Sequence, residues 1–162
     1  MPQPLMDTVI RAADRHQIRE ALIEFASRRH RTHWVTLNTH RDLSMTTAHQ
    51  RLKRWRVEML RRLHGQHFFR IPESERFEYV GVPHLTAAGE PHFHLACAVP
   101  PAVAEKFMRY AEARWKAIVP SGTCHIEQID DKPASQRHVV AYALRVFNPR
   151  YELSFVDSRI YR

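Results

Sequence analysis

Residues 90–99 read EPHFHLACAV, and this stretch constrains how the rest of the chain can be arranged. From residue 93 onward, every second residue faces a core, which is typical of a β-strand with one buried face. Side chains two residues apart on a strand point to the same side, so His92 and His94 project together while Phe93, Leu95 and Cys97 face the opposite way. The pattern predicts a strand that buries one face and presents two imidazoles on the other.

A second strand precedes this one and favours a hairpin. Residues 76–82 are rich in aromatic and β-branched residues, and residues 86–90 read TAAGE, with a glycine suited to a turn. If the two strands pair around this turn, Glu78 can point to the same side of the sheet as His92 and His94 and approach them across the ladder.

This geometry predicts a metal site. Two imidazoles and a carboxylate leave positions for water or phosphate, which metal-assisted phosphoryl chemistry requires. We predict His92 and His94 as ligands and Glu78 as the third ligand. His84 lies an even number of residues from Glu78, so it shares the same face of the strand and lies nearer the turn. It is the alternative third ligand. Two solvated imidazoles on an exposed edge are the alternative without a metal.

The remaining chain alternates between helical and extended patterns. Ser44 can cap a helix that ends at Gly65. Outside the hairpin, the predicted elements are helices at 5–28, 45–64, 101–118 and 133–147 and strands at 33–39 and 123–129. The order β-α-β-β-α-β predicts an α+β fold, a ferredoxin-like split βαβ antiparallel sheet with an added N-terminal helix and a C-terminal helix. We expect a single domain over 1–162, with its core at 32–147 and a final strand or tail at 148–162.

The composition indicates an acidic partner. The chain has 162 residues, a formal net charge of +8 and a pI near 10.1. This charge favours a polyanion, nucleic acid before membrane. Cys97 and Cys124 are too few for a disulfide framework. The sequence shows neither a signal peptide nor a run of apolar residues that could span a bilayer. We therefore expect a soluble, cytoplasmic protein that does not act at a membrane.

The helix at 133–147 carries a candidate nucleophile. Its apolar residues cluster on one side, and they are Val140, Ala143, Leu144 and Phe147. Tyr142 falls almost opposite them, together with His138 and Arg145. A tyrosine kept for packing would lie with the apolar group, whereas a phenol beside a cation suits attack on a phosphate. The alternative is a surface tyrosine on an amphipathic helix.

The helix at 45–64 is rich in arginine on its polar faces. We expect sequence-independent contacts with a nucleic-acid backbone from Arg51, Arg54, Arg61 and Arg62, since neutralising phosphates releases counterions. A solvated helix face is the alternative interpretation.

Three motifs, in this order, resemble those of the HUH endonuclease superfamily, especially its rolling-circle replication initiators (Rep proteins). Residues 34–39, WVTLNT, are similar to the family's first-strand motif, a hydrophobic pair followed by Thr-Leu-Thr. Residues 92–94, HFH, match the His-hydrophobic-His signature. Residues 142–145, YALR, resemble the Tyr-x-x-Lys motif, with arginine where lysine is usual. The resemblance covers roughly residues 32–147.

The resemblance implies metal-dependent nicking and joining of single-stranded DNA. In this family a divalent ion polarises the scissile phosphate and the motif tyrosine attacks it, leaving a covalent 5′-phosphotyrosine and a free 3′-hydroxyl. Carried over to this chain, His92, His94 and Glu78 hold Mn²⁺ or Mg²⁺, and histidine ligands favour Mn²⁺. Tyr142 is the nucleophile of a single-tyrosine enzyme, and Arg145 takes the place of the assisting lysine.

The resemblance also implies a substrate and a role. The expected substrate is single-stranded DNA at an origin or hairpin, and the expected role is initiation of rolling-circle replication of a plasmid or phage. A host replication helicase or polymerase is a further expected partner. DNA contacts are expected from Thr36, Asn38, Arg51, Arg54, Arg61, Arg62 and His138. The alternatives are a small transposase or relaxase of the same superfamily, a non-catalytic module that binds single strands, and, more distantly, a metal-storage or sensing protein.

Overall fold

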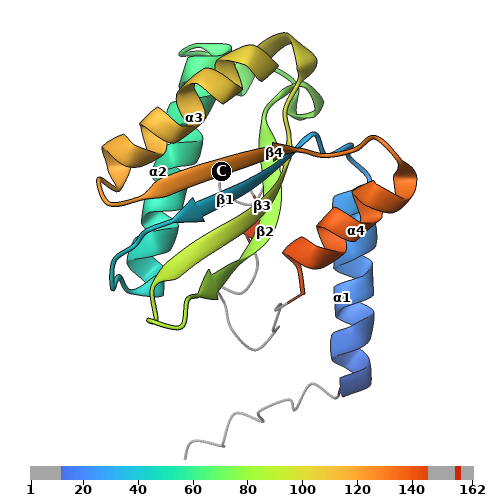
Figure 1. Cartoon of the computed structure of the whole chain (residues 1–162). Helices are drawn as coiled ribbons and strands as arrows, with labels where there is room; N and C mark the ends of the chain where they lie inside the picture. Colours follow the sequence, from blue (N-terminus) through green and yellow to red (C-terminus); the bar gives the residue numbers. More distant parts are fainter. Residues whose placement is uncertain (1–11, 146–155, 158–162) are drawn as a thin grey trace, which may run out of the picture.

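Five strands form one antiparallel sheet in the computed structural model, which describes residues 12–145 and 156–157 (Figure 1). The strands are β1 His33–Asn38, β2 Glu78–Leu85, β3 Pro91–Ala98, β4 Thr123–Gln128 and β5 Val156–Asp157. They lie in the order β4-β1-β3-β2-β5, and every neighbouring pair is antiparallel. The first four strands follow the split βαβ arrangement, so the predicted α+β class and antiparallel sheet are confirmed.

Four α-helices accompany these strands in the described part of the chain. They are α1 Ala12–Ser27, α2 Met45–His64, α3 Ala104–Ile118 and α4 Pro133–Ala143. Short 3₁₀ turns lie at Phe68–Arg70, Glu73–Glu75 and Pro101–Val103. Residues 5–11 of the first predicted helix and residues 146–147 of the last lie outside the described residues.

The two ends of α2 follow from its capping residues. The Ser44 hydroxyl accepts a hydrogen bond from the Thr47 backbone N–H at 3.1 Å, which satisfies one of the unpaired donors of the first turn. At the other end Gly65 adopts a φ of 85°, a conformation that favours glycine. The predicted limits of this helix are therefore confirmed.

The main core lies between the sheet and the layer formed by α2 and α3. Its largest fully buried side chains include Trp55, Phe93, Phe107 and Trp115. Burying a side chain such as Phe93 stabilises the fold by about 1.5–3 kcal/mol. Because Phe93 and Leu95 point into this core, strand geometry turns His92 and His94 to the opposite face of the sheet.

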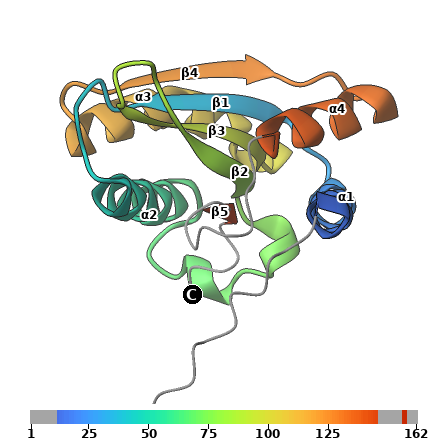
Figure 2. The same ribbon diagram turned by 90° about the horizontal axis from the view of Figure 1, so that it is seen from below.

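That opposite face has an apolar half and a polar half. At one end of the sheet, α1 and α4 lie side by side (Figure 2). The apolar half is formed by strand residues packed against these helices, namely Val80, Val82 and Ala96 with Ile23, Ala26, Val140, Ala143 and Leu144. The polar half lies toward the turn between β2 and β3. It carries Thr36 and Asn38 of β1, His84 of β2, and His92 and His94 of β3.

Gly81 lets β2 approach β3 closely beside this polar half. It pairs with Leu95, and a Cβ atom at this position would collide with the backbone carbonyl of His94. Any larger residue would therefore push the two strands apart. The glycine thus helps to keep the side chains of β2 within reach of the histidines of β3.

The final strand is short. Val156 and Asp157 pair with Gly81 and Val80 of β2. For 148–162 the sequence left a final strand or a tail open; the structure describes a strand at two residues, and the rest of that segment lies outside the described residues. In the part of the chain that the structure describes, no helix combines the length and apolar character needed to cross a bilayer.

Candidate metal and nucleophile site

Three histidines meet on the polar half of the sheet. The imidazole centroids lie 5.2 Å apart for His84 and His92, 4.7 Å for His84 and His94, and 4.9 Å for His92 and His94. One ligand nitrogen from each residue lies within 4.8 Å of the others. The strand register explains the cluster, because His84 lies directly opposite His92 and Val82 lies opposite His94. These three histidines, called the histidine triad below, could hold a metal ion.

The hydrogen bonding of the triad fits metal ligation. Nε2 of His84 and Nδ1 of His92 are buried and have no hydrogen-bond partner among the described residues. Nδ1 of His94 lies 3.1 Å from the Thr36 hydroxyl and forms a hydrogen bond with it, which leaves Nε2 of that ring for a metal. A hydrogen bond to the second ring nitrogen is the usual way in which proteins orient a metal-binding histidine.

The surroundings of the triad favour the uncharged form of its imidazoles. Burial, reinforced by the neighbouring imidazoles and by Arg145, lowers the pKa of His84 to about 4. Burial, with His92 and Arg145, likewise lowers the pKa of His94 to about 4. Burial also lowers the pKa of His92, although a hydrogen bond from its ring to the backbone of Glu90 acts in the opposite direction and raises it. Neutral imidazole is the form that coordinates metals.

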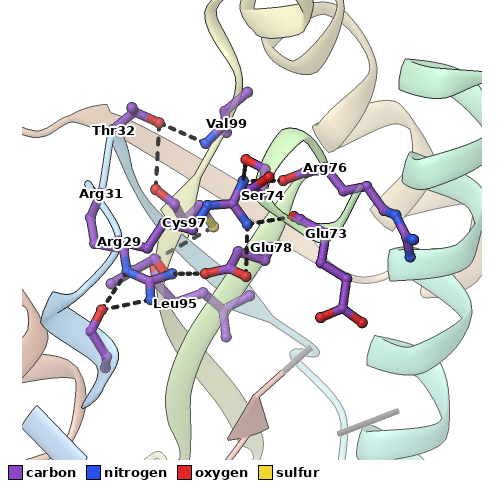
Figure 3. A network of polar contacts seen from close by, with 12 residues as sticks. Arg29, Arg31, Thr32, Glu73, Ser74, Arg76, Glu78, Leu95, Cys97 and Val99 are labelled. Carbon is purple, nitrogen blue, oxygen red and sulfur yellow. Dashed lines mark hydrogen bonds and ion pairs between the residues drawn. The ribbon is translucent and has the colours of Figure 1, made fainter. Parts of the chain in front are cut away.

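Glu78 does not belong to this cluster, so its prediction as the third ligand is wrong. Glu78 lies opposite Ala98, six residues before His84 along β2, which corresponds to roughly 20 Å of strand. Its buried carboxylate instead pairs with Arg29 at 2.7 Å and with Arg31 at 3.2 Å (Figure 3). The alternative ligand, His84, occupies the place expected for the carboxylate.

The charged pairs around Glu78 join the end of α1 to the sheet. The Arg31 guanidinium also donates to the carbonyl oxygen of Ala26 in α1, with the shorter bond at 2.7 Å. Arg29 donates to the carbonyl oxygens of Glu73 and Ser74 at 3.0 and 2.8 Å (Figure 3). Glu78 thus compensates two guanidinium groups far from the triad, and its role is structural.

We expect Glu78→Gln to lower the free energy of unfolding by about 3 kcal/mol, because it leaves buried guanidinium charge uncompensated. The affinity of the variant for Mn²⁺ should equal that of the parent protein, since the Glu78 carboxylate is not near the triad. Urea denaturation and calorimetric Mn²⁺ titration measure the two effects. Glu58→Gln is a matched control, because Glu58 pairs with Arg54 within one helix and should cost about 0.5 kcal/mol or less. A large fall in Mn²⁺ affinity for Glu78→Gln would restore Glu78 as a ligand.

Helix α4 brings Tyr142 to the edge of the triad. Tyr142 is 40% exposed, and its ring centroid lies 6.2 Å from that of His94. Trp34 contacts both residues, because it stacks on His94 at 5.4 Å with an interplanar angle of 19° and meets Tyr142 edge-on at 5.4 Å. The Arg145 guanidinium carbon lies 4.0 Å from the Tyr142 ring centroid. A phenol, a guanidinium and a potential metal centre therefore lie side by side.

The other residues predicted to contact DNA divide between the two faces of the sheet. Thr36 and Asn38 share the triad's face, and Asn38 lies directly opposite His92. His138 is exposed on α4. The four arginines of α2, by contrast, belong to the helix that covers the opposite face, and they are Arg51, Arg54, Arg61 and Arg62. The structure does not bring these arginines to the triad.

The polar face of β4 was not predicted from the sequence. Thr123, His125 and Glu127 lie opposite Asn38, Thr36 and Trp34 of β1 and so share the face of the triad. Nε2 of His125 lies 2.8 Å from Oε1 of Glu127. The signal was present in the alternation of residues 123–127, in which these polar residues are interleaved with Cys124 and Ile126.

These features define a class of α+β protein in which the open half of an antiparallel sheet carries a histidine triad with a tyrosine at its edge. The family model described as replication-associated protein ORF2/G2P matches residues 23–146, more than half of the chain. The chain belongs to this family. No curated protein and no solved structure gives a significant match.

Proposed function

We propose that this chain nicks and rejoins single-stranded DNA to initiate rolling-circle replication, with Tyr142 as the nucleophile beside a divalent metal ion held by the triad. The observation that carries the proposal is the position of the Tyr142 ring, 6.2 Å from His94 on the open half of the sheet. Membership of the replication-associated family supports replication over transposition or conjugation. The resemblance of the three motifs to HUH endonucleases supports the chemistry.

The proposed reaction is a transesterification. The phenol oxygen of Tyr142 attacks the phosphorus of the scissile phosphodiester, and the bond between phosphorus and the 3′ oxygen breaks. The phenolic proton passes to solvent and the departing 3′ oxygen takes up a proton. The products are a 5′-phosphotyrosine and a free 3′-hydroxyl. Attack by a 3′-hydroxyl on the phosphotyrosine later reverses these bond changes, joins the strand and frees Tyr142.

The residues around Tyr142 have distinct roles in this proposal. Arg145 supplies positive charge beside the phosphate under attack, since its guanidinium lies over the Tyr142 ring. Trp34 fixes the spacing of His94 and Tyr142 by contacting both. Thr36 orients His94 through its hydrogen bond. A divalent ion bound by the triad would polarise the scissile phosphate.

The three imidazole ligands affect which divalent metal ion the site would prefer. Three imidazoles favour Mn²⁺ over Mg²⁺, because nitrogen ligands suit transition metals better than they suit the harder Mg²⁺. We therefore propose Mn²⁺ as the better cofactor in solution. Thr36, Asn38 and His138 are proposed to contact the strand near the reacting phosphate. The α2 arginines would contact only DNA that continues around to the other face of the molecule.

The test is covalent capture. The full chain is incubated with 3′-labelled single-stranded oligonucleotides and Mn²⁺, and the products are separated on a denaturing gel. We expect a labelled protein–DNA adduct that disappears when EDTA replaces the metal. Binding that depends strongly on salt, with no adduct in any divalent metal, would instead support the non-catalytic binding module.

A further inference from the structure

A groove of about 320 Å³ opens between α4 and the strands β1 and β4, next to the triad. We infer that this groove holds one unpaired nucleobase adjacent to the scissile phosphate, and that Glu127 makes it prefer bases that carry an amino group. The inference rests on the proposed function, since it specifies the substrate of that same site. A volume of this size is at the lower limit for small-molecule pockets, about 300 Å³, and suits one base.

The aromatic walls of the groove suit a base. Trp34 and Tyr142 both line it. His94 stacks on Trp34 but does not line the groove. Aromatic side chains provide stacking surfaces on which unpaired bases bind with little dependence on sequence.

The charges around the groove indicate different positions for the base and for the phosphate of the DNA. The chain carries a net charge of +8, yet two acidic residues, Glu127 and Asp130, are among those that line this groove. Carboxylates repel a phosphate and accept hydrogen bonds from base N–H groups. Positive charge lies instead beside Tyr142, where Arg145 covers the ring. The phosphate is therefore expected at Tyr142 and Arg145, and the attached base in the groove.

Glu127 supplies the preference among bases. Oε1 of its carboxylate pairs with Nε2 of His125 at 2.8 Å, which leaves Oε2 for a base. Adenine and cytosine present an exocyclic amino group to such an acceptor. Thymine presents a single N–H flanked by two carbonyl oxygens, which a carboxylate repels. Asp130 contributes less, because its carboxylate already accepts from the backbone N–H of Lys132 at 2.8 Å and lies 3.5 Å from Nζ of that residue.

The experiment measures binding of dye-labelled (dA)5, (dC)5 and (dT)5 by anisotropy, in EDTA so that no cleavage occurs. We expect (dA)5 and (dC)5 to bind about five-fold more tightly than (dT)5. Glu127→Gln should remove this difference, because an amide both donates and accepts. Glu112→Gln is the matched control, since it removes the same charge from an exposed position of α3 and should keep the parental ratio. Equal ratios in the parent and in Glu127→Gln would overturn the role of Glu127.

Tryptophan fluorescence locates the base. The chain has three tryptophans, and Trp55 and Trp115 are fully buried, so a base in the groove should quench Trp34 alone. Unlabelled pentanucleotides should quench the parental fluorescence at saturation and leave that of Trp34→Phe unchanged. Binding without quenching would overturn the groove assignment, and nicking would stand if an adduct still formed. Quenching as expected with no adduct in any metal would overturn nicking but keep the groove as a base-binding site.

Discussion

Tyr142→Phe should abolish both strand cleavage and the covalent adduct while leaving DNA and metal binding intact. The change removes one oxygen atom from a residue that is 40% exposed, and the ring contacts with Trp34 and His94 do not require the hydroxyl. Without that oxygen no bond between phosphorus and this side chain can form, so cleavage should fall to the protein-free background. Denaturing gels with a 3′-labelled strand and Mn²⁺ measure the loss, and anisotropy measures the retained binding.

Tyr110→Phe is the matched control for this prediction. Tyr110 lies on α3, on the other side of the sheet, with the guanidinium of Arg62 over its ring at 5.4 Å. This variant should cleave at the parental rate. Mass spectrometry of the parental adduct should place the DNA on Tyr142. DNA on Tyr151 or Tyr161, which lie outside the described residues, would identify another nucleophile, and full activity of Tyr142→Phe would refute the assignment.

The outward position of Tyr142 could be predicted from local sequence because helical periodicity is set by the backbone alone. The predicted apolar side of that helix is buried at Val140, Ala143 and Leu144, and Phe147 lies outside the described residues. Tyr142 and His138 are exposed, as their opposite placement predicted. The same locality explains why the ends of α2 were predicted correctly, since Ser44 and Gly65 act on the nearest turn of the helix.

The third member of the triad could not be predicted in the same way, because the alternation of a strand fixes the face of a residue and not its position along the ladder. Glu78 and His84 share one face of β2, and only the register decides which of them reaches His92. The predicted strand ended at residue 82, whereas β2 continues to Leu85 and places His84 opposite His92. The guanidinium partners of Glu78 come from a distant part of the chain, which no local pattern reveals.

The α2 arginines illustrate a second limit of local patterns. Periodicity correctly places Arg54, Arg61 and Arg62 on the exposed side of their helix. It does not say which face of the sheet the helix covers. The buried residues of α2 pack on the face that Phe93 and Leu95 occupy, opposite the triad. Two of the arginines also have partners within the protein, since Arg54 pairs with Glu58 and Arg62 lies over Tyr110.

His84→Ala should abolish Mn²⁺ binding and DNA cleavage together. The substitution removes one of three nitrogens that lie within 4.8 Å of one another. Changes to residues that merely support a ligand cost about 10–100-fold in metal affinity, so loss of a ligand should cost at least 100-fold. Calorimetric titration with Mn²⁺ measures the affinity without DNA, and the adduct assay measures the activity. His64→Ala is a matched control, because His64 is half-buried on α2 and its Nε2 accepts a hydrogen bond from the Phe77 backbone N–H at 3.1 Å.

Comparing His84→Ala with Glu78→Gln tests the register of β2, because the register decides which of the two residues belongs to the triad. The two residues share a strand and a face, but one contributes to the triad and the other to the pairs with Arg29 and Arg31. The structure therefore requires opposite phenotypes. His84→Ala should remain folded and lose the metal, whereas Glu78→Gln should lose stability and keep the metal. Parental Mn²⁺ affinity in His84→Ala would show that His92 and His94 recruit a different third ligand, and the triad would no longer describe the metal site.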